Sequence, residues 1–197
     1  MVVTVLITTF TTKIISNLNT KKIVITGGPG TGKSSVIDEL IKRGFTCYKE
    51  ISRDIILEAQ EQGISQLFLT NPLLFSERLL DGRKLQYENA INDPADTVFF
   101  DRGVPDIVAY MDFKGENYPS YFLEACRDCL YDYVFILKPW KDIYITDNER
   151  YENFEQVLGI HAHLSRTYQN YNYKLLDVPF DTVSNRADYI LKTLARK

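Results

Sequence analysis

The sequence contains a glycine-rich stretch whose residue types and spacing suit the binding of a phosphate group. Residues 27–35 read GGPGTGKSS, which matches the phosphate-binding pattern G-x-x-x-x-G-K-[ST]. Glycines let the backbone turn tightly and point successive N–H groups at an anion. The lysine of the pattern reaches the outer phosphates of a nucleotide, and the next hydroxyl binds Mg²⁺. We therefore expect a nucleoside triphosphate site that uses ATP and Mg²⁺. The residues expected to surround the phosphates are Gly28, Pro29, Gly30, Thr31, Gly32, Lys33, Ser34 and Ser35, and Lys33 is also a candidate catalytic residue.

Two carboxylates are candidates for metal binding and proton transfer. Asp101 ends an apolar run, as does the aspartate that accompanies Mg²⁺ in many P-loop proteins, so Ser34 and Asp101 are the expected metal ligands. Glu50 stands between a strand-like run and a helix-like run, where a carboxylate suits proton transfer from a substrate hydroxyl. Which of the two acts as the base stays open. The plainer readings are a turn aspartate and a glutamate that favours the positive end of a helix.

Several polar side chains near these carboxylates could contact a substrate. Arg53, Arg102 and Asp106 are expected to do so together with Glu50. Arg150 is expected to act catalytically from a lid over the phosphates, where such an arginine can contribute about 10³–10⁵ in rate. The competing reading of Arg150 is a surface ion pair with a nearby acid such as Asp147. Two side chains of the long helix expected nearby, Arg78 and Gln86, could complete an acceptor site.

The elements that would position these residues alternate along the chain. A β-branched run at residues 22–26 predicts a strand before the phosphate loop, and apolar spacing over 33–43 predicts a helix after it. Alternation of this kind predicts a parallel sheet with helices on both faces, and ligands bind at the carboxyl ends of such strands. We expect the strands before Glu50 and Asp101 to flank the strand of the phosphate loop. The other expected strands are 45–50, 97–101, 133–139 and 172–180. The other expected helices are 51–63, 71–91, with Gly82 as a point of relaxation, and 182–196, and apolar residues over 151–158 also have helical spacing.

Composition limits the class of protein and its partners. The chain has 197 residues and a net charge of −3, and it shows no long cluster of Lys and Arg, so no nucleic-acid partner is expected. It has no apolar run long enough for a membrane span. The three cysteines Cys47, Cys126 and Cys129 are expected as reduced thiols in a cytoplasmic protein, with zinc at the C-x-x-C pair as the less favoured alternative. His161 and His163 lack an evident third metal ligand.

The first 20 residues differ from the rest. Residues 1–20 are rich in Val, Ile and Thr and lack the features of a signal peptide, so they are expected to form an N-terminal arm of unassigned role. Residues 21–197 are expected to form one P-loop domain. The sequence gives no indication of the oligomeric state.

Several segments together resemble a known family. KIVITGGPGTGKSS, YKEISRD, VFFDRGVPD, LKPW and DNERYENFEQ resemble the small AAA-type P-loop ATPase family that includes the nicotinamide riboside kinase domain of the bacterial NAD-biosynthesis regulator. The resemblance covers residues 21–197 and implies a three-layer α/β/α P-loop NTPase fold, kinase-like, with a mostly parallel five-stranded sheet and a lid segment. It also implies an acid-x-x-Arg after the second strand, an acid-Arg after the third, and an arginine in the lid. By position these are Glu50, Arg53, Asp101, Arg102 and Arg150.

Two functions remain open at this stage. The favoured one is an ATP- and Mg²⁺-dependent phosphotransferase that acts on a small hydroxyl metabolite, with a nucleoside-like compound as one candidate. The alternative is a nucleotide-binding switch or slow NTPase, using ATP or GTP, that works through a protein or lipid partner. A Ras-like GTPase is disfavoured because the sequence has no N-K-x-D or T-K-x-D motif and no D-x-x-G after the third strand.

Overall fold

The structure, a computed structural model, describes residues 20–144 and 152–196. The arm expected at residues 1–20, apart from Thr20, and part of the expected lid lie outside the described residues. Along the chain the elements are β1 (Lys21–Gly27), α2 (Lys33–Lys42), β2 (Thr46–Tyr48), α3 (Ser52–Glu61), α4 (Leu67–Thr70), α5 (Pro72–Ile91), β3 (Thr97–Asp101), α6 (Val104–Lys114), α7 (Tyr121–Asp128), β4 (Tyr133–Leu137), the short 3₁₀ turn η2 (Lys141–Ile143), α8 (Phe154–Asn170), β5 (Leu175–Val178) and α9 (Val183–Ala195).

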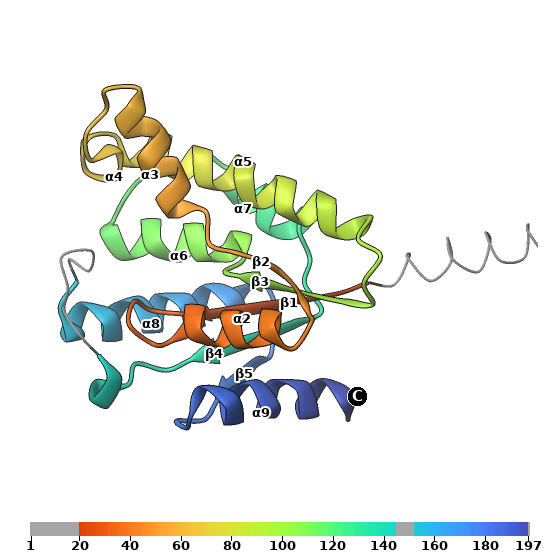
Figure 1. Ribbon diagram of the computed structural model, residues 1–197. Helices are drawn as coiled ribbons and strands as arrows, with labels where there is room; N and C mark the ends of the chain where they lie inside the picture. Colours follow the sequence, from red (N-terminus) through yellow and green to blue (C-terminus); the bar gives the residue numbers. More distant parts are fainter. Residues whose placement is uncertain (1–19, 145–151, 197) are drawn as a thin grey trace, which may run out of the picture.

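The described strands form one parallel sheet in the order β2-β3-β1-β4-β5. The central strand β1 therefore lies between β3 and β4, and its loop opens at the carboxyl edge of the sheet (Figure 1). The expected α/β/α P-loop fold with a five-stranded, mostly parallel sheet is confirmed. Each parallel crossover runs through at least one helix, as parallel strands require.

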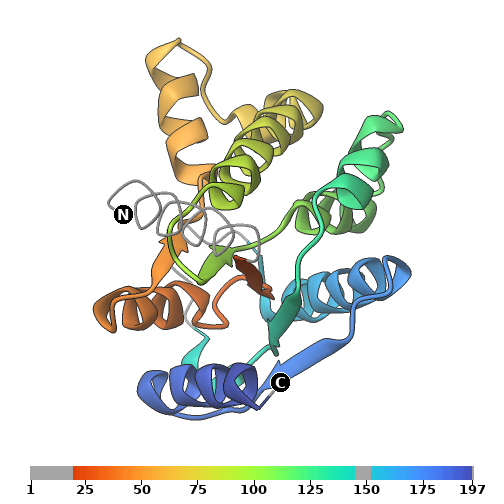
Figure 2. The ribbon, with the colours of Figure 1, turned by 90° about the vertical axis from the view of Figure 1, so that its right-hand side faces the viewer.

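Helices cover both faces of the sheet because side chains alternate along each strand. On one face, Ile23 and Ile25 of β1 pack with α2 and α9. On the other face, Val24 packs in a cluster with Tyr168 of α8 and Ala90 of α5. Figure 2 shows the two helices α2 and α9 on one side of the sheet and the remaining helices on the other.

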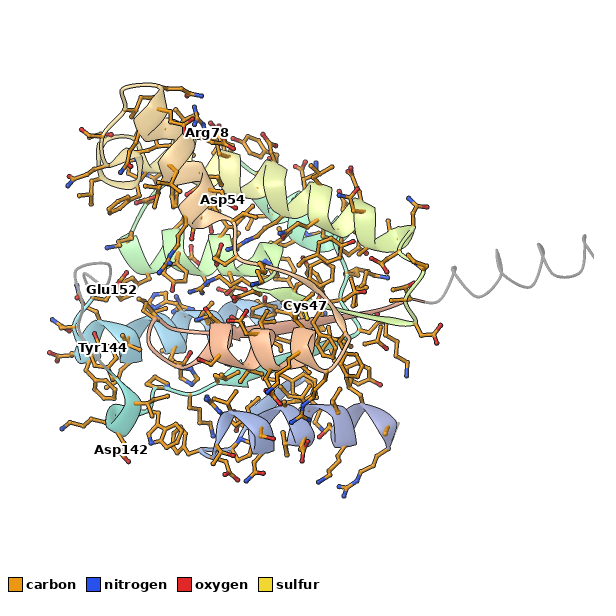
Figure 3. The ribbon with its side chains drawn as sticks, viewed as in Figure 1. Cys47, Asp54, Arg78, Asp142, Tyr144 and Glu152 are labelled. Carbon is orange, nitrogen blue, oxygen red and sulfur yellow. The ribbon has the colours of Figure 1, made fainter. Side chains whose placement is uncertain are left out.

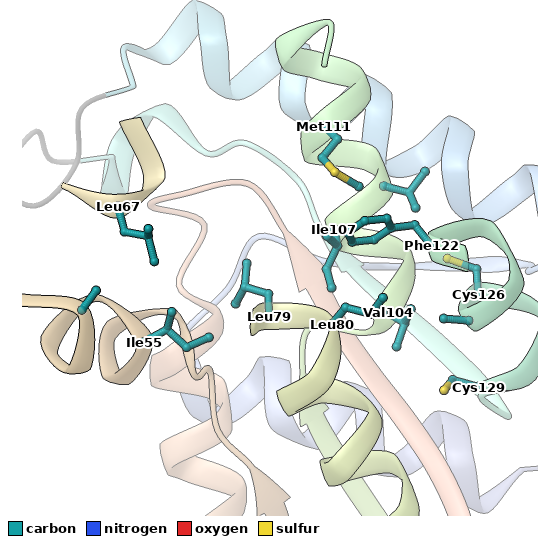
Figure 4. Packing of buried hydrophobic residues seen from close by; sticks show 13 residues of the cluster. Ile55, Leu67, Leu79, Leu80, Val104, Ile107, Met111, Phe122, Cys126 and Cys129 are labelled. Atoms are coloured by element: carbon teal, nitrogen blue, oxygen red, sulfur yellow. The ribbon is translucent and has the colours of Figure 1, made fainter. Parts of the chain in front are cut away.

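A second apolar core lies away from the sheet. It joins α3, α4, α5 and α7 to the outer side of α6, through residues such as Ile55, Leu80 and Ile107 (Figure 4). Cys126 and Cys129 are buried free thiols in this core, and burial raises the pKa of both thiols. This core supports the long helix α5, whose Arg83 contacts Glu50 after β2 and Gly103 after β3.

The expected elements are confirmed, with differences at their ends and in their connections. Three described helices, α4, α6 and α7, had no explicit counterpart in the sequence analysis. The helix α5 runs unbroken through Gly82, so this glycine introduces no bend. It allows close packing instead, because a Cβ there would lie 2.3 Å from the Cδ1 methyl of Ile51. The expectation that the strand before Glu50 flanks β1 is wrong, since β3 lies between β2 and β1.

Among the described residues, no helix combines the length and the apolar character that crossing a membrane requires.

Candidate functional site

The phosphate loop connects β1 to α2, and hydrogen bonds within the loop help to fix its shape. Thr31 donates a hydrogen bond to the Gly28 carbonyl at 2.9 Å, and the Lys33 ammonium donates to the same carbonyl at 2.8 Å. Gly30 and Gly32 have positive φ angles of 70° and 83°. Both donors hold the Gly28 carbonyl, and N–H groups of a loop in this conformation can face an anion.

Loop residues lie against neighbouring elements too closely for side chains. A Cβ on Gly27 would lie 2.5 Å from the carbonyl oxygen of Leu137 in β4. A Cβ on Gly28 would lie 2.9 Å from Val157 in α8. The glycines therefore let the loop pack against β4 and α8 while its inner side stays open to a ligand.

Lys33 begins α2 and is buried beside the loop. Burial lowers its pKa from 10.5 to about 7, helped by the nearby Arg102 and opposed by Asp101 and Asp106. A phosphate group in the loop would add negative charge and favour the protonated lysine. The two following residues, Ser34 and Ser35, are exposed at the first turn of α2.

Asp101 ends β3 and lies in the register next to Ile25 of β1. Its side chain is buried, and the Oδ1 atom has no hydrogen-bond partner among the described residues. Burial raises its pKa, although Lys33 and Arg102 oppose that effect. An unpartnered buried carboxylate oxygen beside a phosphate loop fits the oxygen ligands that Mg²⁺ prefers. Mg²⁺ would thus be held by the expected ligands Asp101 and Ser34, with which this donor set is compatible.

Glu50 reaches the site although β2 does not neighbour β1. Its Oε1 accepts hydrogen bonds from the backbone N–H groups of Ile51 and Ser52 at 3.0 and 3.1 Å. The carboxylate therefore stabilises the N-terminal end of α3. Its Oε2 lies 2.6 Å from Nε of Arg102. Burial opposes ionisation of this carboxyl, but Arg83 and Arg102 outweigh it and hold the pKa of Glu50 at about 2.

Arg102 links the phosphate loop to the acidic side chains. Its Nη1 donates to the Gly27 carbonyl at 3.2 Å and to Oδ1 of Asp106 at 3.2 Å. Its guanidinium also lies over the ring of Tyr110, 5.1 Å from the centroid. The residue has a φ angle of 77°, a left-handed conformation that few non-glycine residues adopt. Such strain often marks a functional position.

Asp106, which the sequence led us to expect at the substrate, lies in the first turn of α6. Its side chain is 0% exposed. Both oxygens are engaged within the protein, by Thr26 at 2.6 Å, Gly103 N–H at 3.0 Å and Tyr168 at 2.5 Å. With these donors and Arg102 around it, Asp106 holds the loop after β3 in place, and direct contact with a substrate would require a large rearrangement.

The remaining sequence candidates lie at different distances from this cluster. Arg53 is exposed on the first turn of α3. Arg78 donates to Gln62 on the α3–α5 side of the molecule (Figure 3), and Gln86 donates to the backbone carbonyl next to Glu50 in sequence. Arg150 lies outside the described residues.

Arg83 belongs to the same cluster, although its sequence position did not single it out. It lies in the middle of α5, is 4% exposed, and donates to the Gly103 carbonyl at 2.9 Å. Its Nη2 is 3.3 Å from both carboxylate oxygens of Glu50. No local motif surrounds residue 83. The one signal is that an arginine stands on the inner side of an otherwise apolar helix face.

A group of aromatic and basic residues on the β4–β5 side of the loop was also missed. Trp140, after β4, stacks on Phe180, after β5, with ring centroids 5.1 Å apart. Arg186 of α9 lies over the Trp140 ring and donates to the Thr31 carbonyl of the phosphate loop at 3.0 Å. Tyr144 packs on Gly30 of the same loop.

Tyr144 also connects the loop to the start of α8. Its hydroxyl donates to the Glu152 carbonyl, and its ring meets Phe154 edge-on. Figure 3 places Tyr144 and Glu152 close together at the end of the molecule where α8 begins. The LKPW segment was noted in the sequence only as part of a family resemblance.

Comparison with known proteins agrees with the fold described above. A family model described as an AAA domain matches residues 22–186. No curated protein gives a significant sequence match.

Solved structures share the fold at low sequence identity. Deoxyadenosine kinase from M. mycoides superposes with a TM-score of 0.68 at 19% identity, over 89% of this chain and 100% of that chain. Thymidylate kinase from Candida albicans gives 0.65 at 16% identity, over 90% and 92%. The NadR protein, solved with NAD and AMP-PNP, gives 0.66 at 15% identity and covers 93% of this chain, which spans about half (51%) of NadR.

Proposed function

Since the chain belongs to the AAA domain family, we propose that it is an ATP- and Mg²⁺-dependent phosphotransferase that acts on a small hydroxyl metabolite. One observation carries this proposal: the phosphate loop lies between two chemically different surroundings. Acidic and basic side chains meet on its β2–β3 side, and aromatic side chains gather on its β4–β5 side. A phosphotransferase needs such a division, because donor and acceptor must approach the transferred phosphate from opposite directions.

The donor nucleotide occupies the β4–β5 side in this proposal. Its phosphates lie in the loop against Lys33, and its base extends toward Trp140 and Phe180, whose flat faces suit a purine ring. Arg186 supports the loop from this side. Stacking on aromatic rings tolerates any base, so this arrangement leaves the choice between ATP and GTP to polar contacts.

The acceptor occupies the β2–β3 side. Bound Mg²⁺ would be held by Ser34 and Asp101 and would offset the charge that develops on the transferred phosphoryl group. Arg102 lies between the loop and Glu50, so it can face both the phosphoryl group and the acceptor. We assign Asp106 to holding Arg102 and the loop after β3, in place of the substrate contact that the sequence suggested.

Proton transfer from the acceptor hydroxyl is assigned to Glu50 or Asp101. Glu50 stays ionised near neutral pH and faces the acceptor side, so it can orient the hydroxyl. Asp101 has a raised pKa and an unpartnered oxygen, but metal binding would occupy that oxygen. We therefore favour Glu50 for the hydroxyl and Asp101 for the metal. The nucleoside and nucleotide kinases that share this fold make nucleosides the first acceptors to test.

A nucleotide switch or slow NTPase is the second candidate, and one observation favours it. The two oxygens of Glu50 already receive two backbone N–H groups and two arginines, which together use most of the acceptor capacity of a carboxylate. A protein without a free base beside its loop would hydrolyse nucleotide slowly. It could then act as a switch whose state depends on whether nucleotide is bound. An acceptor assay separates the two candidates.

The test uses the full chain with Mg²⁺-ATP and Mg²⁺-GTP. Thermal-shift measurements rank the nucleotides, since a ligand that binds only the folded state stabilises it by mass action. ADP release is then measured with and without a panel of nucleosides and other small alcohols, with Lys33→Ala as the matched inactive control. We expect at least one acceptor to raise ADP release about tenfold or more above the acceptor-free rate. If Mg²⁺-ATP binds but no acceptor stimulates release, and Glu50→Gln behaves like the wild type, the switch replaces the phosphotransferase.

Residues 21–197 form the proposed catalytic domain. The free thiols of Cys47, Cys126 and Cys129 are compatible with the cytoplasmic location that we propose for it. No role is proposed for residues 1–20.

A further inference from the structure

Arg83 is a buried cation that neither the phosphate loop nor the expected substrate contacts explain. It comes from the middle of α5, far in sequence from the residues it meets. Its Nη1 donates to the Gly103 carbonyl at 2.9 Å, and its Nη2 lies 3.3 Å from each oxygen of Glu50. One guanidinium therefore connects the loop after β3 with the segment after β2.

The carboxylate of Glu50 is held from three elements at once. Arg83 approaches it from α5 and Arg102 approaches it from the end of β3, at 2.6 Å from Oε2. The backbone N–H groups of Ile51 and Ser52 approach Oε1 from the start of α3. A side chain held in this way has one orientation, whereas a glutamate in solvent samples many rotamers.

The close packing of α5 places Arg83 next to Glu50. The preceding residue, Gly82, lies so close to Ile51 that a Cβ there would be 2.3 Å from the Ile51 Cδ1 methyl and would displace it. A glycine in a helix interior is less favourable than an alanine. Close approach of α5 to the segment that carries Glu50 offsets that cost, and it brings the Arg83 guanidinium within reach of the carboxylate.

A purely structural ion pair would be the simpler account of Arg83. A buried ion pair is a poor source of stability, because the desolvation of both charges offsets their attraction. The Nε atom of Arg83 is buried with no hydrogen-bond partner in the part of the chain that the structure describes, which adds to that cost. Stability alone therefore gives little reason to place an arginine here.

We propose that Arg83 is a positioning residue that holds the Glu50 carboxylate toward the acceptor, with Arg102 on its other side. The proposal rests on the proposed phosphotransferase function, in which Glu50 orients the acceptor hydroxyl. Arg83 acts through Glu50 and through the Gly103 carbonyl, which accept its hydrogen bonds among the described residues.

Removal of Arg83 has a consequence that does not require activity. The charged groups that act on Glu50 are Arg83 of α5, Arg102 after β3, Lys33 of α2 and Asp101 of β3. Burial raises the pKa of Glu50, and the two arginines lower it to about 2. Without Arg83, one of the two opposing cations is lost, so the pKa of Glu50 must rise.

The experiment compares Arg83→Met and Arg83→Lys with Lys84→Met, an exposed cation at the next position of the same helix. The Glu50 carboxyl is titrated by ¹³C NMR in each full-length protein, with Glu50→Gln to assign its signal. We expect Arg83→Met to raise the pKa of Glu50 by about one unit or more, and Lys84→Met to leave it unchanged. Arg83→Lys should lie between them, because an ammonium keeps the charge without the two-pronged geometry.

Kinetics with the best acceptor provide the second readout. Arg83→Met should lower kcat by about ten- to a hundredfold, the usual size of a small misplacement, while Mg²⁺-ATP affinity stays within about twofold of the wild type. Its kcat should also decline with falling pH at a higher pH than in the wild type. If Arg83→Met does not fold, Arg83→Lys carries the test through the same readouts.

An unchanged Glu50 titration in the Arg83 variants overturns the positioning role, and so does a kcat loss no larger than that of Lys84→Met. Failure of the proposed function would be seen in a different measurement, because no acceptor would then stimulate ADP release by the wild-type protein. In that case the NMR titration still shows whether Arg83 lowers the pKa of Glu50.

Discussion

The charges around the phosphate loop balance one another. Three cations, Lys33, Arg83 and Arg102, meet three carboxylates, and the closest pairs are joined at 2.6–3.3 Å. Removing one member of such a cluster leaves its partner buried without compensation, which costs more than the pair itself contributes. Substitutions here should therefore be chosen to keep the shape and change only the charge. The carboxylates of the cluster are Glu50, Asp101 and Asp106.

Lys33 should make nucleotide binding sensitive to pH. Its pKa is about 7 in the ligand-free protein because of burial, and bound phosphates should raise it. Above about pH 7 the free protein then carries a neutral lysine that must gain a proton when Mg²⁺-ATP binds. Calorimetry at pH 8 in buffers of different ionisation enthalpy should record proton uptake, and affinity should fall as the pH rises from 7 to 9.

The control for this prediction is Lys33→Ala, which should bind Mg²⁺-ATP much more weakly and without that proton uptake. Equal affinity in the two proteins would remove Lys33 from the nucleotide site.

Glu50 and Asp101 should separate in their effects when each loses its charge. Glu50→Gln keeps the loop intact, so Mg²⁺-ATP binding should persist while acceptor-dependent transfer falls by about 10²–10⁴ if Glu50 takes the proton. Asp101→Asn replaces an oxygen of the expected metal ligand, so the Mg²⁺ concentration for half-maximal rate should rise.

Titrations of Mg²⁺ at fixed ATP distinguish these effects. If Glu50→Gln changed the Mg²⁺ requirement and Asp101→Asn did not, Glu50 would be the metal ligand and Asp101 the base.

At the scale of elements, neighbouring elements hold the phosphate loop in shape. β4 lies under Gly27, α8 lies against Gly28, and Arg186 of α9 lies against Gly32. The loop is therefore a junction of elements that are distant in sequence. A change at these contacts should disturb both the fold and the ligand site.

Gly27→Ala should be much more damaging than Gly44→Ala. Both glycines have positive φ angles, 148° and 89°, which strain any other residue. A Cβ at Gly27 would also meet the Leu137 carbonyl at 2.5 Å, whereas nothing lies within 4 Å of one at Gly44. We expect Gly44→Ala to lower the free energy of unfolding by about 1 kcal/mol and Gly27→Ala by about 3 kcal/mol or more.

Urea denaturation of the two variants measures that difference. If both variants lost a similar free energy of unfolding, β4 would be able to move away from residue 27 and would not constrain the loop.

At the scale of the whole molecule, the strand order divides the site. Because β1 lies between β3 and β4, one side of its loop faces the ion-pair cluster and the other faces Trp140, Phe180 and Arg186. The second apolar core then holds α5 over the ion-pair side only. We propose that this asymmetry assigns the nucleotide base and the acceptor to separate halves of the molecule.

Trp140 should report on the nucleotide half, and it is the only tryptophan among the 197 residues. Binding of Mg²⁺-ATP should change its emission, because a base would enter the surroundings of its stacked ring. Inorganic tripolyphosphate with Mg²⁺ should occupy the loop with a much smaller change, and an acceptor alone should cause none. An equal response to tripolyphosphate and ATP would place the base elsewhere.

The sequence by itself determined the parts of the site that consist of neighbouring residues. The loop at residues 27–35, its flanking strand and helix, and the carboxylate that ends β3 follow from local patterns of glycine, apolar and charged residues. The α/β class follows in the same way, because alternating strand and helix patterns require a parallel sheet.

Only the tertiary structure decided which distant side chains complete the site. Arg83 lies 33 positions from Glu50, and Arg186 lies 155 positions from Thr31, so no local pattern links either pair. The burial of Asp106 and the place of β3 between β2 and β1 likewise depend on how the elements pack. Sequence patterns report the local preferences of the backbone, whereas these contacts arise from chain segments that meet only after folding.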